Sequence, residues 1–332
     1  VIDHYNTSLV TVGGKWNHMA AMPGPYGGQA RQFDMPPLSD FSGAGPARLN
    51  LALEGGDANA LPEISVYPRN KRFIDLYNSG TGAVRWSAKA SDDWVRLSES
   101  SGQFDKQLRI WVSVDWDKAP KGRHRATITF TAAGRSLRAS VTAFNPAAPA
   151  PSEVAGFVES CGYVSMEAEH YSRKADRGGA GWEIVDGLGR TGSSVTVLPP
   201  TVAAISADAV ASASPVLEYD VYLFSTGKVT VNLYSSPTRP INAEYKLRYA
   251  AAFDDAAPTE ITGGSGSVVD NVRKMQKQFT IDKPGRHVLK IWMVDPGMVL
   301  DKIVIDTGGV VDSYLGPPES FCGGKRTSRD SR

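Results

Sequence analysis

The chain has 332 residues, and its 36 lysines and arginines nearly balance its 35 aspartates and glutamates, for a formal net charge of +1. A dedicated nucleic-acid-binding protein needs a cationic surplus to neutralise phosphates, so this balance argues against one. No apolar run approaches the roughly 20 residues that a membrane helix needs. We therefore expect neither nucleic acid nor a membrane as a partner. The 33 glycines and 21 prolines favour turns and short strands over long helices.

The first 145 residues fall into two parts. Residues 1–62 are rich in Gly, Pro and Met without periodicity, which predicts an irregular segment that packs on a neighbouring domain. Residues 63–145 alternate apolar and polar side chains between turn-prone stretches, which predicts an immunoglobulin-like (Ig-like) β-sandwich. We expect Trp86, Trp94 and Trp111 on its strands, filling the core. The seven expected strands are 64–68, 72–78, 84–90, 94–100, 108–116, 124–133 and 137–145.

The remainder of the chain predicts a second sandwich. Residues 146–155 form a Pro/Ala linker, which marks a domain boundary. Residues 156–320 alternate again with little helical signal, as is typical of a jelly roll, and residues 321–332 predict a disordered tail. The predicted fold is all-β: an Ig-like β-sandwich followed by a jelly-roll β-sandwich.

The two ends of the second domain carry the two cysteines, Cys161 and Cys322. A disulfide between them would close a long loop in the unfolded chain, whereas two unrelated free thiols are the alternative. The chain opens without a signal-peptide pattern, which fits either a mature product or a piece of a longer protein. It has no Walker loop, no HExxH, no CxxC and no GxSxG, and its five histidines are scattered.

An acidic cluster in MEAEHY is the strongest candidate for a metal site. Glu167 and Glu169 share one face of a strand, and two such carboxylates repel each other unless a cation or an arginine lies between them or one of them is protonated. Asp301 is the third oxygen donor if the first and last strands of the domain pair. Carboxylates suit Ca²⁺, so we expect one structural calcium ion. Solvated glutamates on an edge strand are the alternative, and a paired-carboxylate glycosidase site is less favoured because both glutamates lie on one strand.

An aromatic and polar cluster indicates carbohydrate binding. An exposed Trp or Tyr can stack on the apolar face of a sugar while neighbouring polar groups bind its hydroxyls. Trp182 lies in a glycine-rich stretch that predicts a loop, although a role in capping the core is the alternative. The predicted carbohydrate-binding residues are Tyr163, His170, Tyr171, Trp182 and Arg190.

Six motifs together resemble the C-terminal region of glycoside hydrolase family 115, densely over about residues 156–320. They are GKWNHM (14–19), GYVSMEAEHY (162–171), WEIVDGLGRTGSSV (182–195), LRYAAAFDD (247–255), the run 287–309 and SYLGPPES (313–320). Members of that family are xylan α-1,2-glucuronidases, which remove (4-O-methyl)glucuronic acid from xylan. EAE and LDKIVID also resemble carbohydrate-binding modules of families 6 and 35, where such acidic positions hold calcium. Residues 63–144 resemble, more loosely, Ig-like modules of the BACON type.

The resemblance implies a role in a longer protein. The family's catalytic machinery lies in an upstream barrel that nothing here matches, so no catalytic residue is carried over. We expect a non-catalytic accessory or carbohydrate-binding region of a secreted or periplasmic α-glucuronidase. Its expected partners are glucuronoxylan or its oligosaccharides, the catalytic domain of the same protein and a second copy of the chain in a homodimer. The alternatives are an enzyme with an unrecognised site of its own and a protein-interaction or dimerisation scaffold without sugar binding.

Overall fold

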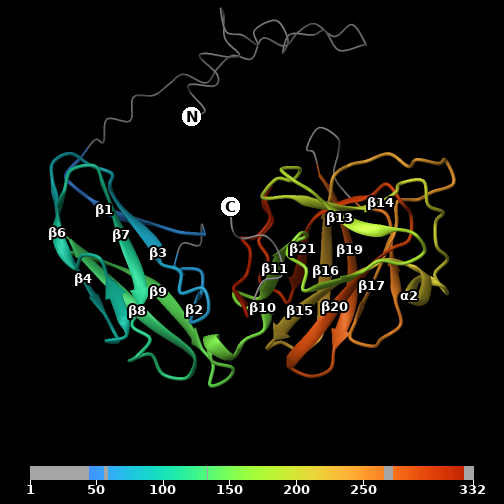
Figure 1. The fold of residues 1–332 in the computed structure, drawn as a ribbon. Coiled ribbons are helices and arrows are strands. Elements are labelled where there is room, and N and C mark those ends of the chain that lie inside the picture. Colours follow the sequence, from blue (N-terminus) through green and yellow to red (C-terminus); the bar gives the residue numbers. More distant parts are fainter. Residues whose placement is uncertain (1–44, 56–58, 133, 265–271, 325–332) are drawn as a thin grey trace, which may run out of the picture. The chain divides into compact units, whose positions relative to one another are not determined.

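The computed structural model describes residues 45–55, 59–132, 134–264 and 272–324. They belong to one compact unit, Gly45–Arg332. Most of the segment predicted to be irregular, residues 1–44, and the tail from residue 325 lie outside the described residues. The described chain is almost entirely β-structure, as predicted (Figure 1). The short helical turns are η2 (Pro151–Glu153) and α2 (Val210–Ala213), and no helix among the described residues could cross a membrane.

The first sandwich consists of two sheets that enclose one apolar core. Alternate residues of each strand point inward, for example Ile74 and Leu76 from one sheet and Ile128 and Phe130 from the other. The first sheet has the order β1 (Leu49–Leu53), β3 (Arg72–Asn78), β7 (Gln107–Val114), β5 (Val95–Leu97). The second has the order β2 (Ile64–Ser65), β9 (Arg135–Asn145), β8 (Gly122–Ala132), β4 (Val84–Ala90), β6 (Ser101–Phe104).

The structure corrects several expectations for this sandwich. Strand β1 lies within the segment expected to be irregular, so the sandwich includes residues before 63. Strand β6 lies where the sequence favours a turn. Trp86 on β4 fills the core as predicted, and Trp94 is also buried but lies in a turn. Trp111 is 43% exposed, because its position on β7 puts it on the outer face, opposite Phe73. The Ig-like topology remains a prediction.

The second sandwich also has two sheets around one core. Both sheets contribute inward residues to a single apolar cluster, such as Tyr219 and Ile291 from one sheet and Leu233 and Ile303 from the other. The first sheet has the order β18 (Thr259–Ile261), β17 (Tyr249–Phe253), β20 (Gly285–Met293), β15 (Val216–Leu223), β10 (Gly156–Val158), β22 (Cys322–Gly323), and β12 (Arg173–Ala175) also pairs with β15. The second has the order β13 (Gly181–Val185), β14 (Ser194–Leu198), β21 (Val299–Asp306), β16 (Gly227–Ser235), β19 (Arg273–Ile281), and β11 (Tyr163–Glu167) also pairs with β21.

The C-terminal end of this sandwich differs from the prediction. Cys322 lies on β22, which pairs with β10, so residues 322 and 323 are part of the sheet and not of a disordered tail. No disulfide joins Cys161 and Cys322, so the structure does not contain the bridge that was one alternative. The Cys161 sulfur instead accepts a hydrogen bond from Arg72 Nη2. The backbone amide of Cys161 donates to Glu63 Oε1 over 3.3 Å.

Aromatic side chains join residues of the two sandwiches. The ring of Phe224 lies 5.0 Å from that of Phe144 and 6.0 Å from that of Tyr67. The Tyr67 hydroxyl donates to the carbonyl of Pro149 in the linker, over 3.0 Å. Burial is the main reason that the pKa of this hydroxyl lies well above its ordinary value. The linker is therefore packed against the protein at this point.

Candidate functional site

The three predicted metal ligands lie along one strand pair. Strand β11 pairs antiparallel with β21, with Glu167 opposite Lys302, which confirms that these two strands of the domain are neighbours. The amide of Ala168 donates to the carbonyl of Asp301 over 3.0 Å, so the chain stays in register just beyond β11. Glu167, Glu169 and Asp301 are all buried.

Each of the three carboxylates contacts the loop 189–193. Glu167 accepts the Thr191 hydroxyl over 2.9 Å, and Glu169 accepts the Ser193 amide over 2.7 Å. Asp301 accepts the Arg190 amide over 3.3 Å. Glycines permit this approach, because a Cβ at Gly189 or Gly192 would lie 2.5 Å from a carboxylate oxygen. The glycine-rich stretch that predicted an exposed loop is therefore held against the acidic cluster.

Two cationic side chains partly neutralise this cluster. Lys302 Nζ lies 3.1 Å from Glu167 Oε1, and Arg190 Nε lies 3.4 Å from Asp301 Oδ2. The second oxygens of Glu167 and Glu169 are buried without a hydrogen-bond partner in the described part of the chain. Burial raises the pKa of both glutamates, because the charged form loses its hydration.

A bound cation would satisfy part of this arrangement. Two buried, unpartnered carboxylate oxygens are the donors that Ca²⁺ prefers. Against this, Lys302 and Arg190 already occupy positions beside Glu167 and Asp301, and the described residues contain no group of three or more acidic, His or Cys side chains close enough to hold a metal ion. The calcium ion therefore stays a prediction, with Glu169 as the carboxylate that has room for it.

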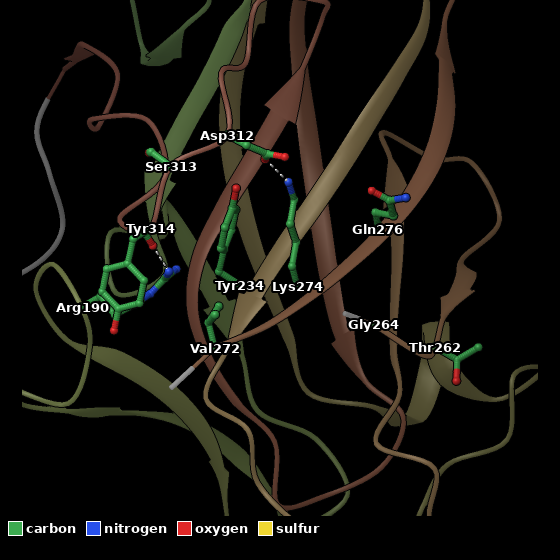
Figure 2. Close-up of a pocket in the computed structure, with 10 residues that line it drawn as sticks. All are labelled: Arg190, Tyr234, Thr262, Gly264, Val272, Lys274, Gln276, Asp312, Ser313 and Tyr314. Atoms are coloured by element: carbon green, nitrogen blue, oxygen red, sulfur yellow. Dashed lines mark hydrogen bonds and ion pairs between the residues drawn. The ribbon is translucent and has the colours of Figure 1, made fainter. Parts of the chain in front are cut away.

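A hollow of about 700 Å³ lies beside the same loop, on the outer face of β16 and β19 (Figure 2). The Arg190 guanidinium lies between two aromatic rings, 5.1 Å from the centroid of Tyr234 and 5.3 Å from that of Tyr314. Arg190 also donates to the Tyr314 carbonyl. Lys274 pairs with Asp312 over 2.8 Å at the opposite wall. The lining residues are Arg190, Tyr234, Thr262, Gly264, Val272, Lys274, Gln276, Asp312, Ser313 and Tyr314.

Arg190 is the predicted carbohydrate-binding residue that lines this hollow. Its side chain is only 5% exposed, and Nη2 has no hydrogen-bond partner among the described residues. A buried cationic donor without an acceptor is costly, so the position favours a ligand that brings an oxygen. Tyr314 is 58% exposed and offers a ring for stacking.

The other four predicted binding residues do not line the hollow. Trp182 corrects the prediction most clearly: it is 1% exposed, it stacks on Tyr249, and its indole N–H donates to the Pro215 carbonyl over 3.1 Å. The reason is that residues 181–185 form strand β13, which turns Trp182 into the core. Tyr171 packs on the same core.

Tyr163 and His170 have contacts of their own. Tyr163 begins β11, and burial raises its pKa to about 12. His170 Nδ1 lies 2.6 Å from Glu319 Oε1. Sequence reasoning missed Tyr234, Lys274 and Tyr314, which line the hollow. The alternation of KVTVNLYSS places Tyr234 outward, but nothing local indicates that residues 312–314 lie beside it.

Comparisons with known proteins show what the second sandwich is similar to. Residues 156–319 match the family model for the glycosyl hydrolase family 115 C-terminal domain. The match indicates a carbohydrate-related accessory domain over this segment, in line with the prediction from the motifs. No curated protein matches the sequence.

Solved structures similar to the chain include whole enzymes and single modules. A family GH115 4-O-methyl-α-glucuronidase with specificity for decorated arabinogalactans shares 16% identity at a TM-score of 0.33, over 49% of this chain and 19% of that one. The C-terminal family 6 carbohydrate-binding module of LamC from Zobellia galactanivorans shares 14% identity at 0.30, over 43% of this chain and 98% of that one. A family 35 carbohydrate-binding module from Clostridium thermocellum shares 11% identity at a TM-score of 0.30, over 43% of this chain and 96% of that one. The chain thus spans about a fifth of the glucuronidase.

Proposed function

We propose that this chain is the non-catalytic C-terminal part of a xylan α-1,2-glucuronidase, and that its family 115 domain binds acidic sugar side chains of glucuronoxylan. The full-length protein would remove (4-O-methyl)glucuronic acid, and the catalytic domain would be a partner of this region. The site of action would be secreted or periplasmic, where polysaccharide is encountered. The observation that carries the proposal is the buried Arg190 guanidinium beside a hollow of about 700 Å³, with an Nη2 that finds no hydrogen-bond partner in the described ranges.

The chemistry of the hollow suits a uronic acid. The Arg190 guanidinium can donate to a carboxylate, and charge-assisted hydrogen bonds of this kind are about twice as strong as neutral ones. Lys274 adds a second cation, and its partner Asp312 has a side chain that is 88% exposed and able to turn away. The ring of Tyr314 can stack on the sugar. A neutral sugar would offer Nη2 a hydroxyl oxygen but no charged acceptor.

Calorimetric titration tests this site. The ligand is a xylo-oligosaccharide carrying one 4-O-methylglucuronic acid, and the control ligand is the undecorated oligosaccharide. We expect Tyr314→Ala and Lys274→Ala to weaken binding of the acidic ligand about tenfold each, which is about 1.4 kcal/mol. Lys277→Ala is the matched control, since Lys277 lies on the same strand and outside the lining. Acidic-ligand affinity that is unchanged in both variants would contradict the site.

We also propose that Glu167, Glu169 and Asp301 hold one structural Ca²⁺. The ion would neutralise the buried carboxylates and fix the loop 189–193 that carries Arg190. Thermal unfolding with calcium against a chelator measures this: added Ca²⁺ should raise Tm through mass action, and Glu169→Gln should remove the rise. Equal Tm values with and without calcium would contradict the ion.

The same titration separates the alternative function. If neither ligand binds, the two sandwiches remain candidates for a protein-interaction or dimerisation scaffold. Sedimentation of the chain alone then measures whether it forms a homodimer.

A further inference from the structure

The sheet opposite the Arg190 hollow carries a second series of hollows. Strands β15 and β20 pair with each other (Figure 1). Their inward residues belong to the core. Their outward residues include Glu218 opposite Lys290 and Val216 opposite Trp292. Three hollows of about 780, 210 and 240 Å³ border this outer face and the hairpin β13–β14.

These hollows follow one another along the surface. The first and second share Arg177 as a lining residue, and the second and third share Asp254. The first begins at Leu198, which is 45% exposed, and the third ends at Ala155 near the linker. We call this series the β15–β20 groove. Its serial arrangement suits an extended chain that contacts several hollows at once, and not a compact single-ring ligand.

An unsatisfied donor lies in the middle of the β15–β20 groove. Trp292 lines the second hollow and is 5% exposed, and its indole N–H has no hydrogen-bond partner within the described residues. Trp182, by comparison, donates its N–H to a carbonyl. A buried N–H without an acceptor costs free energy, and a ligand hydroxyl would supply the acceptor.

Several charges along the β15–β20 groove are paired, and Arg286, which lines the third hollow, donates to the backbone carbonyl of Glu153. Lys290 lies 3.3 Å from Asp255, and Arg173 donates to both Glu218 and Asp220 over 2.7 Å. Arg177 donates to the backbone carbonyl of Ala211. Paired charges offer donors and acceptors for hydroxyl groups, while the exposed carboxylates beside them repel an anion. This contrasts with the Arg190 hollow, where a guanidinium nitrogen lacks an acceptor.

From these observations we infer that the β15–β20 groove is a second glycan-binding site, specific for a neutral, unbranched, polyhydroxylated chain. The domain then binds polysaccharide from both sheets: the Arg190 hollow takes an acidic side chain, and the groove takes neutral backbone. The inference rests on the proposed function only for the choice of xylan as the glycan.

Titration of the 332-residue chain with xylohexaose, a neutral probe, tests the groove. Ala256 lines the second hollow and is exposed, so Ala256→Trp fills it without disturbing the core. Ala257→Trp is the matched control, because Ala257 is the next residue, is exposed and does not line the hollow. We expect Ala256→Trp to weaken xylohexaose binding at least tenfold and Ala257→Trp to leave it unchanged. Trp292→Phe should weaken binding severalfold, with unfolding transitions confirming that each variant is folded.

The outcomes separate this inference from the proposed function. The groove is not a glycan-binding site if xylohexaose binds Ala256→Trp as it binds the unmodified chain, or if the unmodified chain does not bind xylohexaose at all. Either result holds even if the acidic ligand binds and its binding depends on Tyr314. Xylohexaose binding that is lost in Ala256→Trp but retained in Tyr314→Ala supports the groove, even if the acidic ligand does not bind.

Discussion

Substituting Trp182 decides whether this residue belongs to the core or to a sugar site. The side chain is 1% exposed, and a buried tryptophan removes about 150–250 Å² from water, worth roughly 4–6 kcal/mol at about 25 cal/mol per Å². Trp182→Phe keeps most of that area. It loses the hydrogen bond to the Pro215 carbonyl, about 1 kcal/mol, and leaves a gap worth about 1 kcal/mol more. We therefore expect a loss of about 2 kcal/mol for Trp182→Phe and about 3–5 kcal/mol for Trp182→Ala.

Urea unfolding followed by far-ultraviolet circular dichroism measures this loss as a lower midpoint at an unchanged slope. A parallel titration of folded Trp182→Phe with the acidic oligosaccharide should give the affinity of the unmodified chain, because Trp182 does not line the Arg190 hollow. The reasoning is refuted if Trp182→Phe keeps its stability and loses its affinity, since that pair of results describes an exposed stacking platform.

Three further predictions concern stability. Burial raises the pKa of Glu169 above 4.5, so the native state holds this proton more tightly than the unfolded state, and the free energy of unfolding falls as pH rises from about 4.5. Glu169→Gln should reduce that fall, measured in the presence of chelator by urea midpoints across pH. The same pH dependence in the variant and the unmodified chain would contradict the role of Glu169. Trp111→Ala should cost less than about 1 kcal/mol while Trp86→Ala costs about 3–5 kcal/mol, since only Trp86 is buried, and equal losses would contradict the two placements. Phe224→Ala should destabilise the chain by about 3 kcal/mol and increase proteolysis at the linker; an unchanged cleavage rate would show that these rings do not hold the linker.

Local alternation in the sequence was enough to predict an all-β chain with two sandwiches and most of the long strands. Side chains alternate with a period of two along a strand, so the pattern can be read from neighbours alone. The pairing of the strands that carry Glu167 and Asp301 was the condition on which Asp301 was predicted as a ligand, and the structure contains that pairing. Two short strands were missed: β6, in which glycine and polar residues dominate, and β13, which a glycine-rich stretch precedes. The pairing partner and not the local sequence stabilises them.

The sites depended on contacts between distant segments. Trp182 looked exposed because glycines flank it, yet pairing of β13 with β14 turns it into the core. Arg190 was predicted to bind carbohydrate from the sequence, but the hollow that it lines also needs residues 312–314, more than a hundred positions away, which bring Tyr314 beside it. The sequence by itself determined which residues alternate and which can carry charge. Only the tertiary structure decided which of them meet, because strand order and loop closure bring together residues that have no local relation in the chain.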